Sequence, residues 1–211
     1  MIKVYYACFE QRFNDEKLHQ MLRQLPTEIQ NKILKFRNWQ DIQRSLLGKL
    51  LLKKGLQDSG YESTLSNLQY NTYGRPFLEG YPDFNITHSG NYAACAVSTQ
   101  GTVGIDLELI RPVDLHHFES QFSKIEWQHI TDSEDTISKF FQYWTIKEAV
   151  IKADGRGMSL PLNSFIIREA QVNVLDKAWH YKALSYFPGH QAHIASEQPL
   201  PADIAANFEL F

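Results

Sequence analysis

The chain has 211 residues, of which 43% are hydrophobic and 21% are charged, and its formal net charge is −3. This composition is typical of a globular protein with one sizeable core or two small half-domains, and it excludes a largely disordered chain. The weak negative charge argues against binding nucleic acid through bulk electrostatics, although a local basic patch can still hold a phosphorylated small molecule.

The first half of the chain predicts a strand followed by helices and then further strands. The opening run IKVYYACF is rich in β-branched and aromatic residues and predicts a strand. Asn14 or Asp15 can cap a short helix, and Pro26 opens a second. A third helix is expected over residues 40–57, where leucines recur at helical spacing. From about residue 68, short apolar runs separated by turn residues predict several strands.

The second half of the chain predicts a similar order. A helical block should extend from Asp114 to about Lys152, with a break near residues 131–134 where Asp132 or Ser133 can cap the longest helix. Glycines then end the helix, and further apolar runs predict strands up to the last part of the chain.

This repeated order predicts an α/β protein of the α+β type with two similar halves, residues 1–105 and 106–211. The run AACAVS near the end of the first half resembles AHIAS near the end of the second, which is weak support for an internal duplication. No Ser- or Gly-rich linker separates the halves, so they should share an interface.

The cysteines and the hydropathy pattern bear on the compartment. Cys8 and Cys95 lie in apolar strand-like runs without metal-ligand spacing, as buried free thiols do. No run approaches the roughly 18 apolar residues that a membrane span needs, and the first residues lack the features of a signal peptide. We therefore expect a cytoplasmic protein that does not enter a membrane.

The string GIDLE places Asp106 and Glu108 two residues apart on a predicted strand, so both carboxylates should point to one face. A strand that shows its polar face to water gives the same pattern. The alternative is a hard cation such as Mg²⁺, which takes oxygen ligands and relieves the repulsion between the two acids. This string alone leaves both interpretations open.

The string WTIKEAVIKADGRG places Glu148 and Lys152 four residues apart on a predicted helix. Counting back by fours reaches Trp144 and Phe140, so the acid and the base continue the most apolar stripe of the helix. An exposed ion pair of this spacing contributes only roughly 0.3 to 0.5 kcal/mol. A pair on an inward stripe instead needs partners that stabilise its charges, and the two strand acids joined through a metal would be such partners.

Polar residues at two predicted turns add cations and hydroxyl groups. In FNITHSG, Thr87, His88 and Ser89 end an apolar strand just before Gly90, where backbone N–H groups can hold an anion. A histidine in a turn is more often simply polar. The YGRP turn adds Arg75. Three carboxylates with scattered cations together indicate phosphoryl transfer or pyrophosphate binding.

Taken together, these strings resemble the 4'-phosphopantetheinyl transferases of the longer, monomeric surfactin-synthetase-activating type. The strings RSLLGKLLLK, YGRP, FNITHSG, GIDLE, FSKIEW and WTIKEAVIKADGRGMSLPLNSF occur in the family's order over about residues 30–167. The resemblance implies two α/β halves related by a pseudo-twofold axis, with the active site at their interface and coenzyme A bound there.

The resemblance also implies an activity. A cytoplasmic, monomeric, Mg²⁺-dependent enzyme would move the 4'-phosphopantetheine arm of coenzyme A to a serine of an apo acyl or peptidyl carrier protein and release adenosine 3',5'-bisphosphate. No nucleic acid or membrane would take part. A non-catalytic coenzyme A or nucleotide-binding protein of the same fold is the alternative.

By the same resemblance, Asp106, Glu108 and Glu148 would hold the metal, and Lys152 would contact the pyrophosphate. The other implied coenzyme A contacts are Lys32, Arg44, Arg75, Pro76, Thr87 and His88. Glu148 is the first choice for the general base, with Glu126 the alternative because it matches a family acid, although an exposed helix residue would give the same sequence.

The chain departs from the family pattern at two of these positions. Arg75 stands where the family usually has Lys, and Thr87 stands where it usually has Ser. The charge and the hydroxyl group are kept, although the planar guanidinium is not equivalent to an ammonium group.

Overall fold

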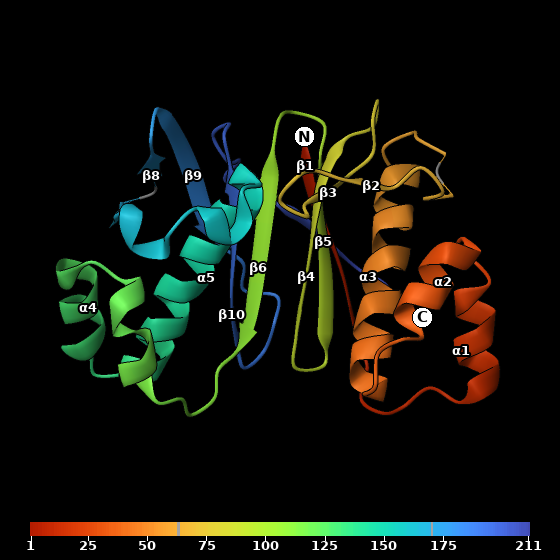
Figure 1. Cartoon of the computed structure of the whole chain (residues 1–211), viewed down its shortest axis with the longest axis horizontal. Helices are drawn as coiled ribbons and strands as arrows, with labels where there is room; N and C mark the ends of the chain where they lie inside the picture. Colours follow the sequence, from red (N-terminus) through yellow and green to blue (C-terminus); the bar gives the residue numbers. More distant parts are fainter. Residues whose placement is uncertain (63, 170) are drawn as a thin grey trace.

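The computed structural model describes residues 1–62, 64–169 and 171–211, and it places two β-sheets between outer layers of helices (Figure 1). The first sheet has the order β11-β1-β5-β4 and consists of β1 (Ile2–Cys8), β4 (Asp83–Ser89), β5 (Tyr92–Ser98) and β11 (Ala205–Phe208). The second has the order β6-β10-β9-β8-β7 and consists of β6 (Val103–Leu109), β7 (Ile167–Arg168), β8 (Gln171–Val174), β9 (Lys177–Ala183) and β10 (His190–Ser196). Neighbouring strands are antiparallel except for β1 and β11, which are parallel. A small separate hairpin consists of β2 (Gln69–Tyr70) and β3 (Pro76–Phe77).

Helices cover the outer face of each sheet. The α-helices are α1 (Asp15–Leu22), α2 (Thr27–Ile33), α3 (Trp39–Gln57), α4 (Lys124–Thr131) and α5 (Thr136–Asp154). Short 3₁₀ helices are η1 (Leu115–Gln121), η2 (Gly157–Ser159) and η3 (Leu162–Ser164). Helix α3 packs on β1 and β5, and α5 packs on β6 and β10. In Figure 1 these two long helices flank the strands on opposite sides, each burying its apolar stripe against a sheet.

The inner faces of the two sheets pack against each other in a shared core. This core draws on both halves and includes Ile2, Val4, Ala94, Ala96, Val103, Ile105, Leu107, Ala192 and Ile194. Because side chains alternate along a strand, Ile105 and Leu107 point into this core, whereas Asp106 points to the opposite face and reaches Lys152 of α5. Glu108 has the same parity as Asp106, so the prediction that the two acids share a face is confirmed.

The two halves repeat one arrangement. The strand order β1-β5-β4 recurs as β6-β10-β9, and each unit carries a 19-residue helix, α3 or α5. The equivalent strands β5 and β10 end alike, because Ser98 accepts from the backbone N–H of Gln100 and Ser196 accepts from that of Gln198, both at 3.2 Å. The predicted α/β class is confirmed, and the AACAVS and AHIAS runs lie on these equivalent strands.

The junction between the two sheets lies in the turn between β5 and β6. The division expected between residues 105 and 106 falls inside β6, a strand that belongs wholly to the second sheet. The sequence pattern does not predict β11, which leaves the second half and pairs with β1, with Ala206 opposite Val4. The halves are therefore tied together both by the shared core and by this last strand.

The predicted helix starts are right for α1 and wrong for α5. Asn14 caps α1, as expected. The cap of α5 is Asp135, whose carboxylate accepts from the backbone N–H of Ser138 at 2.9 Å, and not Asp132 or Ser133. The reason is that α4 continues through residue 131, so Asp132 serves as its C-terminal cap. Among the described residues, no helix combines the length and the apolar character needed to cross a bilayer.

Candidate active site

The strands β4 and β6 lie side by side although they belong to different sheets, and side chains of β4 join them. Alternate residues of β4 point toward β6. Their side-chain oxygens accept hydrogen bonds from backbone N–H groups of β6: Asp83 from Val103 (2.8 Å), Asn85 from Ile105 (3.0 Å) and Ser89 from Leu109 (3.0 Å). A buried backbone N–H without a partner is costly, so these contacts stabilise the junction. We call it the β4–β6 seam.

Gly104 lets α5 lie unusually close to β6. A Cβ atom at this position would lie 2.1 Å from the carbonyl oxygen of Ala149 and 2.4 Å from the nitrogen of Ala153. Only glycine leaves room for the helix backbone at that separation. Asp106 follows two residues later on the same face, so the close approach brings Lys152 of α5 within hydrogen-bond distance of its carboxylate.

Asp106 lies at the centre of the candidate site and is 3% exposed. Lys152 Nζ donates to its Oδ1 atom at 2.6 Å, and the Thr87 hydroxyl lies 3.3 Å from both groups. The other carboxylate oxygen, Oδ2, is buried without a hydrogen-bond partner in the part of the chain that the structure describes. Buried polar atoms usually have partners, so this oxygen is a candidate ligand for a cation.

Two further carboxylates lie near Asp106. Burial raises the pKa of the Glu108 carboxyl above its ordinary value and the Asp106 charge raises it further, while a 2.8 Å hydrogen bond from Ser89 and the Lys152 charge act in the opposite direction. Burial and then Asp106 also raise the pKa of Glu148. These directions mean that the negative charges here are undercompensated, and a bound cation would favour their ionised forms.

The residues fit Mg²⁺ held together with a phosphorylated ligand better than a metal held by protein alone. No three His, Cys, Asp or Glu side chains of the described ranges are grouped closely enough to form a complete metal site by themselves. Mg²⁺ usually keeps several waters and takes one or two carboxylates plus substrate phosphates. The unpartnered Asp106 oxygen and the raised pKa of Glu108 and Glu148 agree with such a site.

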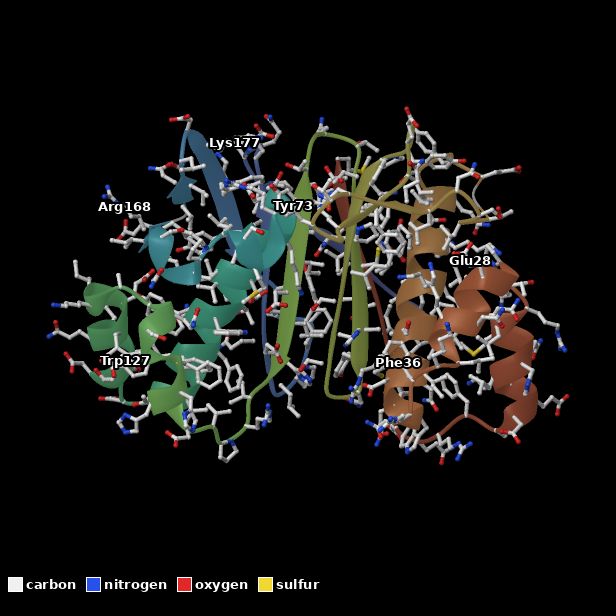
Figure 2. All side chains as sticks on the ribbon, in the orientation of Figure 1. Glu28, Phe36, Tyr73, Trp127, Arg168 and Lys177 are labelled. Atoms are coloured by element: carbon white, nitrogen blue, oxygen red, sulfur yellow. The ribbon has the colours of Figure 1, made fainter. Side chains whose placement is uncertain are left out.

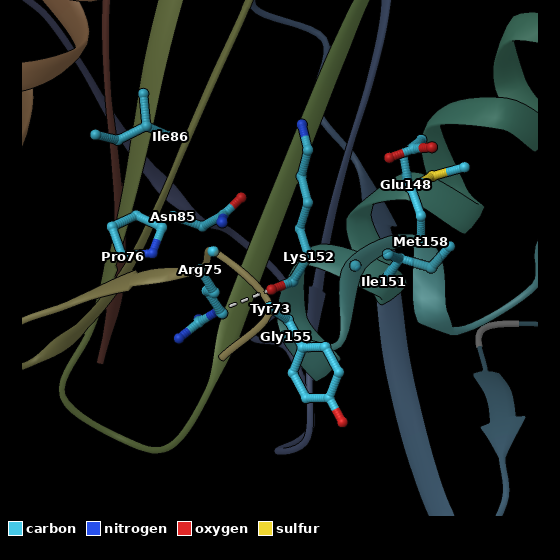
Figure 3. Close-up of a pocket in the computed structure, with 12 residues that line it drawn as sticks. Tyr73, Arg75, Pro76, Asn85, Ile86, Glu148, Ile151, Lys152, Gly155 and Met158 are labelled. Carbon is cyan, nitrogen blue, oxygen red and sulfur yellow. Dashed lines mark hydrogen bonds between the residues drawn. The ribbon is translucent and has the colours of Figure 1, made fainter. Parts of the chain in front are cut away.

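A cavity of about 300 Å³ adjoins these residues (Figure 3). Its walls come from the turn before β3, from β4, from α5 and from the segment after α5, and they include Tyr73, Arg75, Pro76, Asn85, Ile86, Glu148, Ile151, Lys152 and Met158. Figure 3 shows the carboxylate of Glu148 and the amine of Lys152 reaching out from α5, with Pro76 and Ile86 on the other side. The mixture of apolar walls and a few charged groups is typical of a small-molecule site.

Arg75 is bound within the protein framework. Its guanidinium makes two hydrogen bonds to the Asp83 carboxylate, at 2.9 and 2.7 Å, and donates to the backbone carbonyls of Lys152 (2.9 Å) and Val103 (3.1 Å). The Lys152 carbonyl is one of those that a helix end leaves without an intrahelical partner. Arg75 therefore links α5 to both strands of the seam, while Pro76 beside it lines the cavity.

Arg44 and His88 lie close together near the end of β4. Arg44 Nε donates to the carbonyl of Gly90 at 2.8 Å, and its Nη1 donates to Asp41 at 2.9 Å. The surrounding protein lowers the pKa of His88, and the charges of Arg44 and Lys152 lower it further. A neighbouring anion such as a phosphate would counteract this effect.

Lys32 lies at the surface of the first half. It pairs with Glu28 at 3.0 Å, which raises its pKa, and its Nζ lies 5.4 Å from the centre of the Tyr70 ring. Figure 2 shows Glu28 among the helices of the first half and Tyr73, a cavity residue, nearer the middle of the molecule. Within the described residues, Lys32 makes no hydrogen bond or ion pair with Asp106, Glu108 or Glu148. Its predicted role in binding coenzyme A stays a prediction.

Glu126 and Lys147 form a buried ion pair, with 1% and 0% of their side chains exposed and 3.0 Å between the charged atoms. The Glu126 carboxylate also accepts from the backbone N–H groups of Ser123 and Ile167, both at 2.9 Å. Lys147 also donates to the backbone carbonyls of Leu162 (2.8 Å) and Phe165 (2.7 Å). Glu126 is therefore not an exposed helix residue, and these contacts give it a framework role. The role of Glu126 as a proton acceptor stays a prediction, and these framework contacts argue against it.

Several residues that support the site carry no recognisable catalytic signal in the sequence. Lys147, Asp83 and Asn85 hold the site together but match none of the patterns expected of catalytic groups. The alternating polar residues of DFNITHS were a usable signal for the seam, because a strand with polar side chains on one face and a buried neighbour needs partners for them.

Comparison with known proteins defines the class. A family model described as the 4'-phosphopantetheinyl transferase superfamily matches residues 102–204, and a model of the N-terminal region of 4'-phosphopantetheinyl transferases matches residues 12–100. The chain belongs to the 4'-phosphopantetheinyl transferase superfamily. Among its relatives, the 4'-phosphopantetheinyl transferase Sfp of Bacillus subtilis is 30% identical over 96% of both chains. The 4'-phosphopantetheinyl transferase gsp of Aneurinibacillus migulanus is 38% identical over 70% of this chain and 63% of the relative.

Proposed function

We propose that this protein transfers the 4'-phosphopantetheine arm of coenzyme A to a serine of an apo acyl or peptidyl carrier protein. Membership of the superfamily, with relatives of that activity matching nearly the whole chain, supports this reaction. The observation that carries the proposal is the meeting of Asp106, Glu108, Glu148 and Lys152 at the seam between the halves, beside a cavity. Three acids and a cation there suit a pyrophosphate with its metal.

In this proposal the donor lies along the β4–β6 seam. Pro76 and Ile86 would contact the adenine side, and Arg44, Lys32 and His88 the 3'-phosphate, with Thr87 as a further contact. Arg75 would act as a wall of the site through its bonds to Asp83 and α5. Asp106, Glu108 and Glu148 would hold Mg²⁺, which when bound neutralises pyrophosphate charge. Lys152 would turn from Asp106 to a phosphate oxygen.

The transfer itself needs one bond formed, one broken and one proton moved. The carrier serine oxygen bonds to the pantetheine-side phosphorus, and the bond from that phosphorus to the bridging oxygen breaks. Adenosine 3',5'-bisphosphate leaves with the electron pair, and the serine proton goes to Glu148, directly or through water. A bound cation would keep Glu148 ionised, as a proton acceptor must be, and Glu148 lines the cavity beside Lys152. Glu126 is the alternative acceptor.

We further propose a cytoplasmic monomer that uses neither nucleic acid nor a membrane. A single chain supplies both β4 and β6, and therefore both sides of the proposed site. No second copy is needed to complete it. A gel-filtration measurement of the molecular mass, with and without coenzyme A, tests the monomer.

The reaction is tested by mixing the protein with Mg²⁺, coenzyme A and a panel of apo acyl and peptidyl carrier proteins and weighing each carrier. We expect at least one carrier to gain the mass of the phosphopantetheine arm. Unchanged mass for every carrier, with coenzyme A binding intact by calorimetry, would favour the non-catalytic alternative. Unchanged mass together with no coenzyme A binding would reject both.

A further inference from the structure

Ser89 is the last residue of β4, and its hydroxyl contacts groups of the second half. The oxygen accepts from the backbone N–H of Leu109 at 3.0 Å, and the hydroxyl donates to Glu108 Oε2 at 2.8 Å. A hydroxyl has one hydrogen and an ionised carboxylate only accepts, so the direction of the second bond is fixed. Such charge-assisted bonds are stronger than neutral ones. Ser89 therefore orients one oxygen of Glu108.

The hydroxyl of Ser89 is itself held in place by both halves. In the first sheet Ser89 lies opposite Tyr92 in the β4–β5 hairpin. Across the seam its oxygen makes the last of the three contacts that begin at Asp83 and continue at Asn85. The donor to Glu108 is thus fixed by backbone pairing on one side and by a backbone N–H on the other.

A hydrogen-bond partner that orders the side chain matters more for Glu108 than for Asp106. The shorter Asp106 side chain is held by Lys152 at 2.6 Å, with Thr87 beside it. Glu108 has an additional rotatable bond, and ordering it costs more conformational entropy. A hydrogen bond that orders the side chain before a ligand arrives reduces the free energy lost at binding.

We infer that Ser89 is a positioning residue that holds Glu108 in place for the metal and pyrophosphate. The inference rests on the proposed function, because the role of Glu108 as a metal ligand belongs to that proposal. It gives the first half of the chain a direct part in cation affinity, although the three acids all come from the second half. Loss of a partner that orients a metal ligand typically lowers metal affinity by about 10- to 100-fold.

The test compares Ser89→Ala with Ser98→Ala. Ser98 is a matched control because it is buried and also accepts one backbone N–H, from Gln100, but lies on β5 away from Glu108. Mn²⁺ serves as the probe, and its binding in the presence of coenzyme A is measured by electron paramagnetic resonance. We expect Ser89→Ala to weaken Mn²⁺ binding by about 10-fold or more, and Ser98→Ala and Ser89→Thr to change it by less than about 3-fold.

A double-variant cycle separates positioning from general structural support. In a Glu108→Gln background, Ser89→Ala should have little further effect on Mn²⁺ binding, and an undiminished effect would show that Ser89 does not act through Glu108. Equal Mn²⁺ affinity in Ser89→Ala and the parent would also overturn the inference. If Ser89→Ala does not fold, Ser89→Cys replaces it, since a thiol keeps the shape but donates weakly.

Failure of the proposed function gives a different result. If the parent chain binds no Mn²⁺ in the presence of coenzyme A, the metal assignment fails before any variant is compared. If the parent binds Mn²⁺ and transfers the arm but Ser89→Ala does the same with equal Mn²⁺ affinity, only the role of Ser89 fails. Coenzyme A affinity with a chelator present should be the same in every serine variant as in the parent.

Discussion

Lys152 Nζ lies 2.6 Å from Asp106 Oδ1. The amine proposed to contact the pyrophosphate therefore forms an ion pair with a carboxylate proposed to bind the metal. This pair offsets part of the negative charge that Asp106 shares with Glu108 and Glu148. A cation bound to Asp106 would replace the ammonium group in that task and leave Lys152 available for a phosphate oxygen. Metal and coenzyme A should therefore bind with positive coupling.

Asp106→Ala should lower the transfer rate by at least about 100-fold while leaving the fold intact. The substitution removes the central acid, but it also removes repulsion between carboxylates, and Lys152 is exposed enough to reach water. Carrier mass and circular dichroism measure the two effects. Asp58→Ala, which removes the partner of Lys54 at the end of α3 and an acid next to Tyr5, is the control and should keep full activity because it lies outside the candidate site. Full Mg²⁺-dependent transfer by Asp106→Ala would remove the metal assignment.

With metal removed by a chelator, Glu148→Gln should be more stable than the parent at pH 7. Burial and then Asp106 raise the pKa of the Glu148 carboxyl above its ordinary value of 4.5. The unfolded chain therefore loses its proton first, and the parent loses stability as pH rises from the ordinary pKa through the folded-state pKa. Gln cannot titrate, so the difference should disappear once the pH is below 4.5. Urea unfolding at several pH values measures the difference in stability between the variant and the parent. A variant less stable than the parent at pH 7 would contradict the raised pKa of Glu148.

Lys147→Met should lower the free energy of unfolding by about 3 to 5 kcal/mol, because it leaves the Glu126 charge buried without its ion-pair partner. The double variant with Glu126→Gln should recover part of this loss. Lys54→Met, which breaks an exposed pair with Asp58, is the control and should change stability by less than about 1 kcal/mol. Urea unfolding measures all three variants.

Glu126→Gln also separates the two candidate proton acceptors. The amide keeps the shape of the side chain, and its single oxygen can still accept from one of the backbone N–H groups of Ser123 and Ile167, which bond to different oxygens of Glu126. If Glu148 takes the proton, this variant should keep transfer within about 10-fold of the parent wherever it is folded. A loss of about 1,000-fold in kcat with normal coenzyme A binding would instead favour Glu126.

Arg75→Lys should destabilise the protein by about 1 to 3 kcal/mol even though it restores the residue that the family usually has. An ammonium group cannot make both bonds to Asp83 and also reach the two backbone carbonyls that Arg75 contacts. We expect coenzyme A affinity to fall with stability because the same links place the cavity wall. A melting temperature equal to that of the parent would mean that the guanidinium contacts add no stability.

The sequence was sufficient where a single element determines geometry. The period of a strand predicted that Asp106 and Glu108 share a face, and the period of a helix predicted that Glu148 and Lys152 continue the row of the buried Phe140. These relationships need no knowledge of the rest of the fold. Family strings then supplied the connection between the strand acids and the helix.

Relationships between distant segments were beyond the sequence. Glu126 meets Lys147 only because α4, α5 and the segment around residue 165 pack together, and neither periodicity nor spacing encodes that meeting. The cap of α5 was misplaced by a few residues because Asp132, Ser133 and Asp135 are all good capping residues, and tertiary packing decides where a helix starts. The short strand β11 lacks a strong alternating pattern and forms through non-local pairing.

The return of β11 to the first sheet has a consequence for the order of events during synthesis. Strand β1 is made before β11, yet its outer edge is completed by residues 205–208. Until those residues leave the ribosome, that edge offers unpaired backbone groups to any other extended chain. The nascent protein is therefore expected to be more prone to aggregation and more dependent on chaperones before β11 emerges than after it, and removal of β11 should leave this edge of β1 unpaired.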